Sequence, residues 1–323
     1  MTKKGFVKMS IEHLDSRISL VDLMDLSLKE RTGSYIIHED ALTIIETSAS
    51  PSIPHLKKGL SKLNINLEDI QYIILTHIHL DHAGGAGLFL EECPSATVIV
   101  HPKGYRHMND PSRLIAGAKA VYGDDFETLF APIKPIPEER MIVKNNGETL
   151  KLSETCTLTF YDTPGHANHH FSIYDPVSGG MFTGDTCGIQ YRTDEADFYL
   201  PSTSPNQFNP DSMKVAINLF RYKKLNRIYF GHYGMTEDVE HALTKVEMWL
   251  NLFMEKAQQT VSPKASMEEN VENLSVELFN LVKSSFIQQG VDQQHSLFKL
   301  LELDMKVSAM GIVDYLTKKE KEK

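Results

Sequence analysis

The fold of this chain is decided by the stretch Thr76-His77-Ile78-His79-Leu80-Asp81-His82-Ala83-Gly84-Gly85. Four side chains of metal-ligand type fall within six residues, directly after the apolar run Tyr72-Ile73-Ile74-Leu75. A short buried strand that leads into such a loop carries its polar side chains to the carboxyl end of a sheet, where open α/β sheets place their sites. The stretch therefore predicts a metal centre built at a strand end.

The spacing within this stretch divides its ligands into two pairs. In an extended segment alternate side chains point the same way, so His77 and His79 can converge on one metal. Asp81 continues that phase and His82 departs from it, but a turn at these two residues, followed by the permissive pair Gly84-Gly85, would bring both onto a second metal. Imidazole nitrogens and a carboxylate, without a thiolate, favour Zn, Fe or Mn.

Three later motifs each place one ligand-type residue just after a predicted strand. In each case the strand ends, a glycine allows the backbone to turn, and a histidine or an aspartate follows. The motifs are Thr163-Pro164-Gly165-His166, Thr183-Gly184-Asp185 and Gly231-His232. Together with the first stretch, they predict that four strand ends meet at one site.

The composition sets limits on the class of protein. The chain has 323 residues, of which 41% are hydrophobic, and a formal net charge of −10. This size allows one large domain or a large and a small one, and the negative charge argues against binding a nucleic acid through a basic surface. The three cysteines form no C-x-x-C pair, which favours a reducing compartment. No apolar leader follows Met1-Thr2-Lys3-Lys4 and no run of 18 apolar residues occurs, so we expect a cytoplasmic protein that does not span a membrane.

Residues 1–235 alternate short strands with helices and are expected to form the catalytic domain. Helices are predicted over Ser52–Leu63 and Pro210–Tyr222, where apolar residues recur at helical spacing. Strands are predicted where β-branched or aromatic runs are bounded by Gly, Pro or Asp. These runs are Ser34–Ile37, Leu42–Ile45, Tyr72–Leu75, Thr97–Val100, Leu158–Tyr161, Phe171–Tyr174, Gly180–Phe182 and Arg227–Phe230.

Two regions are expected to be helical additions to this domain. Segment 102–139 lies between two ligand motifs and is too long for a plain loop, so we interpret it as a helical lid or wall over the site. Residues 236–323 carry apolar stripes at helical spacing and a capping box at Ser266-Met267-Glu268-Glu269, and they end in a solvated tail. We therefore predict an all-helical C-terminal region that serves as a cover or a dimer surface, with substrate gating as the alternative.

The complete pattern resembles the metallo-β-lactamase superfamily. H-x-H-x-D-H is followed in order by the histidine of T-P-G-H, the aspartate of T-G-D and the histidine of G-H, over roughly residues 30–235. The resemblance implies an α+β fold, a four-layer αββα sandwich, that holds a pair of divalent metal ions. By that resemblance one metal would be held by His77, His79 and His166 and the other by Asp81, His82 and His232, with Asp185 as the bridge.

Within the superfamily the chain is similar to the branch near the hydroxyacylglutathione hydrolases and the acyl-homoserine lactonases, and to a lactonase-like or thioesterase-like group with a long insertion. Residues 110–114 and 118–123 carry that closer likeness. It implies a hydrolase that cleaves an ester, a lactone or a thioester with metal-bound hydroxide, because metal binding lowers the pKa of water from about 15.7 to about 7. The metal is expected to be Zn²⁺, with Fe or Mn as alternatives, and Asp81 and Asp185 are the catalytic carboxylates.

Two other functions stay open. One is a phosphodiesterase or nuclease on the same scaffold, which the net charge of −10 disfavours. The other is a non-hydrolytic di-iron protein that binds oxygen or carries out redox chemistry. His79 stands where flavodiiron proteins carry Glu, and this weighs against the second alternative. The expected partner is a small-molecule substrate, with neither nucleic acid nor membrane, and a homodimer is left open.

Residues around the ligands are assigned supporting roles. His170 is expected to hold the ligand loop by donating to a carbonyl or a carboxylate. His169 is expected at the surface or in the lid, and Cys187 as a small buried residue. The substrate-pocket candidates are Arg113, Tyr122, Tyr191, Arg192 and Tyr199.

Overall fold

The computed structural model describes residues 10–322, so the start of the chain at residues 1–4 and the last residue of the tail lie outside the described residues. The described chain falls into two units, and each is treated separately below. The first comprises the chain up to residue 162 together with 169–184 and 225–237. The second comprises 163–168, 185–224 and the chain from 238 onward. The domain boundary expected at residue 235 stays a prediction.

The first unit contains two β-sheets. The larger has the order β1-β2-β3-β4-β5-β6-β7, antiparallel from β1 to β4 and parallel from β4 to β7. The smaller has the order β15-β14-β11-β10-β9-β8. The strands are β1 Ile11–His13, β2 Ile18–Asp22, β3 Gly33–Ile37, β4 Thr43–Ile45, β5 Tyr72–Ile74, β6 Thr97–Val100, β7 Met141–Val143, β8 Thr149–Lys151, β9 Thr157–Asp162, β10 Phe171–Asp175, β11 Gly180–Gly184, β14 Arg227–Phe230 and β15 Met235–Thr236.

Alternation along these strands builds a core between the two sheets. Ile45, Ile74 and Ile99 of the larger sheet join one apolar cluster with Phe160 and Phe182 of the smaller sheet. The intervening strand residues of the larger sheet, such as Ile73 and Val98, face a second cluster formed with the helices on its other side. Because the larger sheet packs on both faces, its parallel strands are mostly apolar, with Thr43 and Thr97 as exceptions at strand starts.

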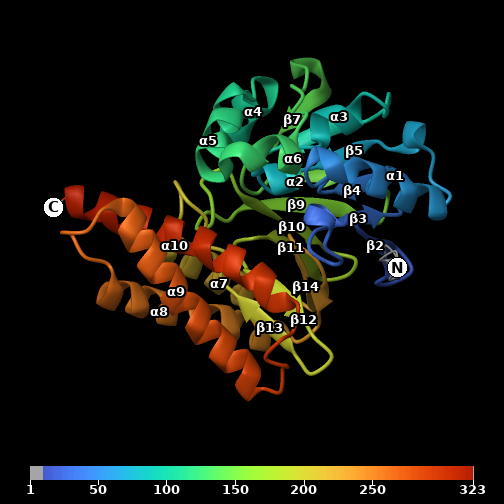
Figure 1. Ribbon diagram of the computed structural model, residues 1–323. Coiled ribbons are helices and arrows are strands. Elements are labelled where there is room, and N and C mark those ends of the chain that lie inside the picture. The colour runs from blue at the N-terminus through green and yellow to red at the C-terminus, as the bar shows by residue number, and fades with distance from the viewer. Residues whose placement is uncertain (1–9, 323) are drawn as a thin grey trace, which may run out of the picture. The chain divides into compact units, whose positions relative to one another are not determined.

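The helices of the first unit lie along the larger sheet (Figure 1). They are α1 Ile53–Lys62, α2 Leu80–Ala83, α3 Ala86–Leu90, α4 Pro102–Asn109, α5 Ser112–Tyr122 and α6 Phe126–Phe130. The last three lie in segment 102–139, which was predicted to be helical. Its apolar residues Phe126 and Phe130 form a small cluster with Leu80, which lies inside the ligand stretch. The insertion therefore packs on the segment that carries the predicted ligands.

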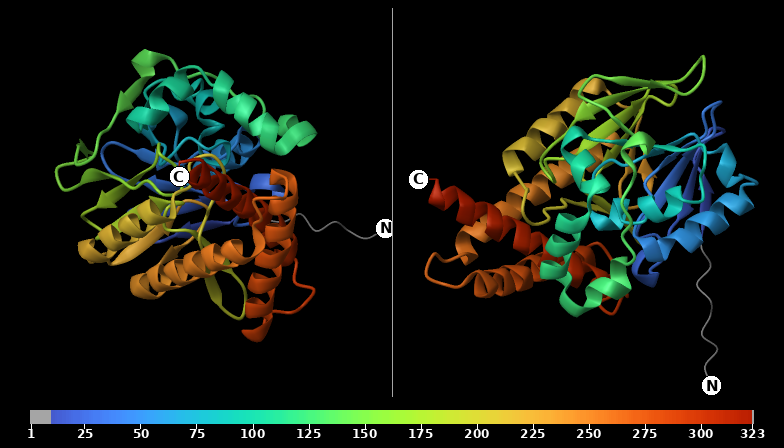
Figure 2. Two further views of the ribbon diagram at one scale, coloured as in Figure 1. Left: turned by 90° about the vertical axis from the view of Figure 1, so that its left-hand side faces the viewer. Right: turned by 90° about the horizontal axis from the view of Figure 1, so that it is seen from above.

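The second unit combines a β-hairpin with four long helices. The hairpin pairs β12 Ile189–Arg192 with β13 Asp197–Leu200, and the helices are α7 Pro210–Lys223, α8 Val239–Thr260, α9 Met267–Gln288 and α10 Leu297–Lys321. Figure 2 shows α7 beside α8, and α9 in orange near the red α10. The Phe198 ring of the hairpin stacks on Phe286 of α9 at 3.6 Å between ring centroids. The predicted C-terminal helical region is confirmed. Ser266 caps the N-terminus of α9, because its Oγ accepts a hydrogen bond from the N–H of Glu269.

Each predicted strand, and each of the helices predicted over 52–63 and 210–222, is present with ends that differ by at most two residues. No strand was predicted between residues 188 and 209, yet this stretch contains the hairpin β12–β13. The alternation in Ile189–Arg192 is too short to separate from a turn by pattern alone. Among residues 10–322, no helix is long and apolar enough to cross a membrane.

Candidate metal centre

The ligand stretch leaves β5 in an extended conformation and then forms one helical turn. His79 is still extended, with φ −62° and ψ 147°, and α2 begins at the next residue. The expected turn at Asp81-His82 is therefore the first turn of this short helix. The rings of His77 and His79 lie 4.8 Å apart between centroids, and those of His77 and His82 lie 4.1 Å apart. His77 and His79 lie on an extended segment and His82 on the helical turn that follows, so the three rings come close together.

The glycine pair after this helix has a different role from the expected one. Gly84 has φ −60° and Gly85 has φ −83°, so neither uses the conformational freedom of glycine. A Cβ atom on Gly84 would lie 2.5 Å from the Leu80 carbonyl oxygen, and one on Gly85 would lie 2.6 Å from Cδ1 of Ile53. The pair is required for close approach of α2 and α3 to their neighbours.

Three predicted ligands of the first unit converge on one point. Ligand atoms of Asp81, His82 and His232 all lie within 4.8 Å of one another. Oδ2 of Asp81 is 3.7 Å from Nε2 of His82 and 3.8 Å from Nε2 of His232. The two histidines are 1% and 4% exposed. Two imidazole nitrogens and one carboxylate at these separations fit a divalent transition metal.

The outer nitrogen of each histidine faces an oxygen atom at 3.2 Å. Nδ1 of His82 lies 3.2 Å from Oε2 of Glu46, and Nδ1 of His232 donates to the carbonyl oxygen of Arg31 at 3.2 Å. Because a carbonyl oxygen can only accept, Nδ1 of His232 carries the proton and Nε2 is left as the metal-binding atom. The carboxylate behind His82 directs its Nε2 toward the same point.

Glu46 was not predicted from the sequence. It follows β4, adopts a left-handed conformation at φ 70°, and is buried. Its other oxygen, Oε1, accepts the N–H of Thr76 at 2.7 Å, so one carboxylate supports both the start of the ligand stretch and His82. The only signal in the sequence is an acidic residue directly after a strand, which is too common to identify it.

A buried ion pair lies behind His232. Oδ2 of Asp25 is 3.3 Å from Nε of Arg31, whose carbonyl oxygen accepts from His232. Burial raises the pKa of Asp25, and the charge of Arg31 opposes that shift. The segment is unusual because Met24, Leu26 and Glu30 all adopt positive φ between 52° and 58°. Non-glycine residues in this region are strained, and such strain is concentrated at functional sites.

Two further histidines line the ligand stretch in the first unit. His170 is fully buried, with its ring 5.1 Å from that of His77 between centroids. The prediction that His169 lies at the surface or in the lid is wrong, because this residue is 6% exposed and its Nδ1 lies 3.4 Å from the backbone nitrogen of Ile78. Burial beside β10 could not be inferred from a His-His pair alone.

The second unit brings the remaining two predicted ligands together. Nε2 of His166 lies 3.8 Å from Oδ2 of Asp185, and both residues are 2% exposed. Nδ1 of His166 donates to the carbonyl oxygen of Ser202 at 2.9 Å, and Oγ of Ser202 donates to Oδ2 of Asp185 at 3.2 Å. Nε2 of His166 is again left as the metal-binding atom.

Covalent connections tie this pair to the first unit. The chain leaves that unit after Asp162 and returns at His169, so His166 lies on a six-residue excursion. Asp185 directly follows Gly184, the last residue of β11. Gly184 has φ 51°, and a Cβ there would lie 2.3 Å from Nε2 of His170. As predicted, a glycine turns the backbone immediately before this ligand.

The substrate-pocket candidates are dispersed. Arg113 is exposed on α5, Tyr122 packs on Phe130, and Arg192 is half-buried at the end of β12. Tyr191 is buried and donates to Oδ2 of Asp304 at 2.8 Å, and Tyr199 is buried with its ring 5.9 Å from that of His241. Cys187 is fully buried, as expected. A role in substrate binding stays a prediction for all five candidates.

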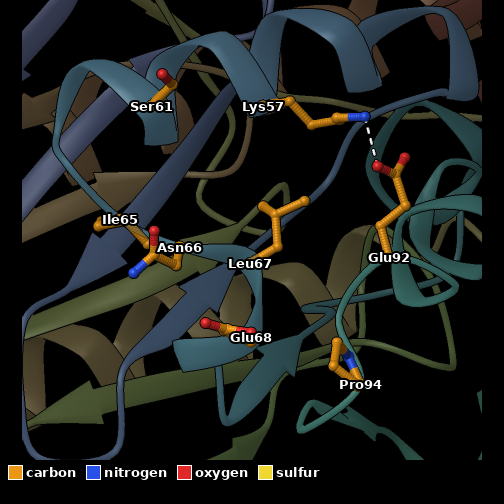
Figure 3. A pocket seen from close by; sticks show the side chains of 8 residues that line it. All are labelled: Lys57, Ser61, Ile65, Asn66, Leu67, Glu68, Glu92 and Pro94. Carbon is orange, nitrogen blue, oxygen red and sulfur yellow. Dashed lines mark hydrogen bonds and ion pairs between the residues drawn. The ribbon is translucent and has the colours of Figure 1, made fainter.

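A shallow surface hollow of about 600 Å³ in the first unit lies apart from these residues (Figure 3). Its lining includes Lys57 and Glu92, which form an ion pair at 2.5 Å across one side. None of the predicted ligands lines this hollow. We therefore assign it no part in the metal chemistry.

Comparison with known proteins identifies the family. The model of the Metallo-beta-lactamase superfamily matches residues 31–232, which include all seven predicted ligands. The chain belongs to this superfamily. It shares 28% identity over 198 residues with the metallo-beta-lactamase fold-containing protein ST1585 of Sulfurisphaera tokodaii, covering 58% of this chain and 71% of that protein.

The chain is also similar to one solved structure and to one further protein sequence. The superfamily protein TTHA1429 from Thermus thermophilus superposes with a TM-score of 0.66 at 17% identity, covering 95% of each chain. At that identity the likeness shows the fold alone, and it agrees with the predicted metallo-β-lactamase fold. The N-acyl homoserine lactonase AttM of Rhizobium radiobacter is 29% identical over 114 residues, which cover 35% of this chain and 39% of that protein.

Proposed function

We propose that this protein is a dinuclear metal-dependent hydrolase that cleaves an ester, a lactone or a thioester of a small molecule. The observation that carries the proposal is the convergence of Asp81, His82 and His232 on one point, with an oxygen atom 3.2 Å from the outer ring nitrogen of each histidine. Surface histidines are not oriented in this way, whereas metal-binding histidines almost always are.

The second metal position rests on the other ligands and on the family pattern. His77 and His79 lie next to this cluster in the first unit, and His166 and Asp185 form a pair in the second. In the superfamily arrangement, these residues would complete the second position, with Asp185 as the bridge.

The residues present define the chemistry. Divalent ions bound here would supply hydroxide at neutral pH and polarise a carbonyl group. Asp81 is 26% exposed on its side chain, so it can orient an attacking water and accept its proton while still contacting the cluster. The burial of His82 and His232 excludes bulk water and strengthens the electrostatic interactions within the site. Nothing in this set requires a serine or cysteine nucleophile.

The finer assignments belong to the same proposal. Zn²⁺ is the preferred ion and Fe or Mn the alternatives, because nitrogen and oxygen donors without thiolates suit all three. The similarity to a lactonase supports acyl chemistry over phosphodiester chemistry. The net charge of −10 supports a small-molecule substrate over nucleic acid.

The test combines metal analysis with a substrate panel. Purified protein is expected to contain about two metals per chain and to hydrolyse at least one member of a panel of acyl thioesters and lactones but no phosphodiester. His166→Ala and Asp185→Ala should reduce both metal content and turnover, whereas His55→Ala and Asp194→Ala, which alter residues outside the ligand set, should change neither. Iron with oxygen chemistry and no hydrolysis would contradict the proposal, and so would full metal content in both ligand variants.

A further inference from the structure

The loop between β13 and α7 connects the ligand pair of the second unit to the rest of that unit. Ser202 in this loop contacts both ligands, through its carbonyl oxygen to His166 and its hydroxyl to Asp185. The hydroxyl of Ser204 lies 3.3 Å from Nε2 of His166. The conformation of this short loop therefore sets the orientation of both ligands.

Helix α10 contacts this loop along one face. Oγ1 of Thr203, which is 1% exposed, donates to the carbonyl oxygen of Ser308 at 3.0 Å. Further along, the ring of Phe208 contacts Tyr315, and Nζ of Lys318 donates to the carbonyl oxygen of Asn206 at 2.7 Å. The helix residues are spaced so that they fall on one side of an α-helix.

The closest approach is at Gly311 of the same helix face. A Cβ added there would lie 1.8 Å from the carbonyl oxygen of Thr203 and 2.7 Å from the carbonyl carbon of Ser204. The backbone of α10 at Gly311 therefore approaches the loop backbone at both Thr203 and Ser204. A glycine inside a helix costs about 1 kcal/mol relative to alanine, so this close contact has to offset that cost.

We propose that α10 is a positioning element for the metal site. Gly311 on this helix and Thr203 on the loop that it contacts are the positioning residues. They act through Ser202, which fixes the Nδ1 proton of His166 and holds the Asp185 carboxylate. The inference rests on the proposed function in that His166 and Asp185 are taken as metal ligands. It gives the C-terminal helical region a role in the centre that a cover or a dimer surface would not have.

Two matched pairs of variants test this role. Thr203→Val keeps the shape but removes the hydroxyl that binds Ser308, and Thr203→Ser keeps the hydroxyl. Gly311→Ala forces the loop away from the helix, whereas Gly117→Ala makes the same change in α5, where no atom lies within 4 Å of the new Cβ. Full-length metal-free protein is titrated with Co²⁺, and affinity, stoichiometry and the visible absorption spectrum are recorded beside the thermal melting of the metal-free form.

We expect Thr203→Val and Gly311→Ala to weaken the more weakly bound Co²⁺ by about 10–100-fold and to alter its absorption spectrum, which is the usual effect of losing an outer contact to a ligand. Thr203→Ser should restore wild-type affinity and spectrum, and Gly117→Ala should leave both unchanged. A contact that only stabilises the fold would lower the melting temperature without changing the spectrum of the loaded protein.

Equal Co²⁺ affinity and spectra in the Thr203→Val and Thr203→Ser proteins would overturn the proposal, whatever happens to stability. If Gly311→Ala does not fold, the Thr203 pair still decides the question. Hydrolysis is a separate readout: a wild-type protein that binds two Co²⁺ ions but cleaves no substrate contradicts the proposed function. The positioning role would then still be judged by the metal affinities of the variants.

Discussion

Replacement of Glu46 by glutamine isolates the carboxylate that supports the ligand stretch. One oxygen of Glu46 accepts the N–H of Thr76 and the other lies 3.2 Å from Nδ1 of His82. Glutamine fills the same volume but offers one acceptor oxygen and one NH₂ group. Its oxygen can face only one of the two groups, the N–H of Thr76 or Nδ1 of His82. Its NH₂ group then faces the remaining nitrogen in a buried site, where neither group can accept a hydrogen bond from the other.

The size of the effect follows from these contacts. Loss of the carboxylate that faces His82 should weaken metal binding by roughly 10–100-fold, the range measured for outer partners of metal-binding histidines. Each factor of ten in affinity corresponds to about 1.4 kcal/mol. The left-handed backbone at φ 70° is unchanged, so strain does not enter the comparison.

The assay is competition between the protein and a chelator for Zn²⁺, with thermal melting of the metal-free form measured in parallel. Glu92→Gln is the matched control, because Glu92 pairs with Lys57 at the surface hollow and exposed pairs contribute at most about 1 kcal/mol to stability (Figure 3). A Glu46→Gln protein with Zn²⁺ affinity within twofold of wild type would refute the assignment of Glu46 as the partner of His82.

Two further predictions concern groups outside the predicted ligand set. Although burial opposes its ionisation, the hydrogen bond from Arg17 holds the pKa of Asp175 below its usual range. Its stabilisation is therefore present above the unfolded pKa of about 3.9 and is lost as pH falls through the lower folded value. Asp175→Asn should cost about 3 kcal/mol in urea unfolding at pH 7, a deficit that shrinks below about pH 4; a deficit independent of pH would contradict this reading. Burial raises the pKa values of Cys93 and Cys156 to about 12, so neither thiol should react with a disulfide reagent at pH 8 until denaturant is added; rapid labelling of the native protein would show this to be wrong.

Most of the regular structure could be predicted because its determinants are local. The runs at 97–100 and 227–230 became β6 and β14 with the predicted ends, since β-branched and aromatic residues bounded by turn residues specify a buried strand. The ligand stretch was identifiable for a related reason: donors of one type at fixed spacing after a strand are rare. The hairpin at 189–200 was missed because four residues of alternation carry too little signal.

The supports of the site could not be predicted, because each depends on contacts between distant parts of the chain. Glu46 is 36 residues from His82, which it contacts at 3.2 Å. Thr203 is 105 residues from Ser308, the residue that accepts its hydrogen bond. An isolated glutamate or threonine gives no indication of such a contact.

In each unit a backbone carbonyl accepts from one predicted ligand histidine, Arg31 for His232 in the first and Ser202 for His166 in the second. A carbonyl is present at every residue, so the identity of the supporting residue matters less than the conformation of its loop. In the first unit Asp22 sets that conformation, since its Oδ1 accepts the N–H groups of Met24 and Glu30 on either side of the strained turn.

In the second unit the same task falls to α10, through Thr203 and the close approach at Gly311. Changes at these loop-setting residues should therefore alter metal binding even though none of them is close enough in sequence to a ligand to belong to a motif.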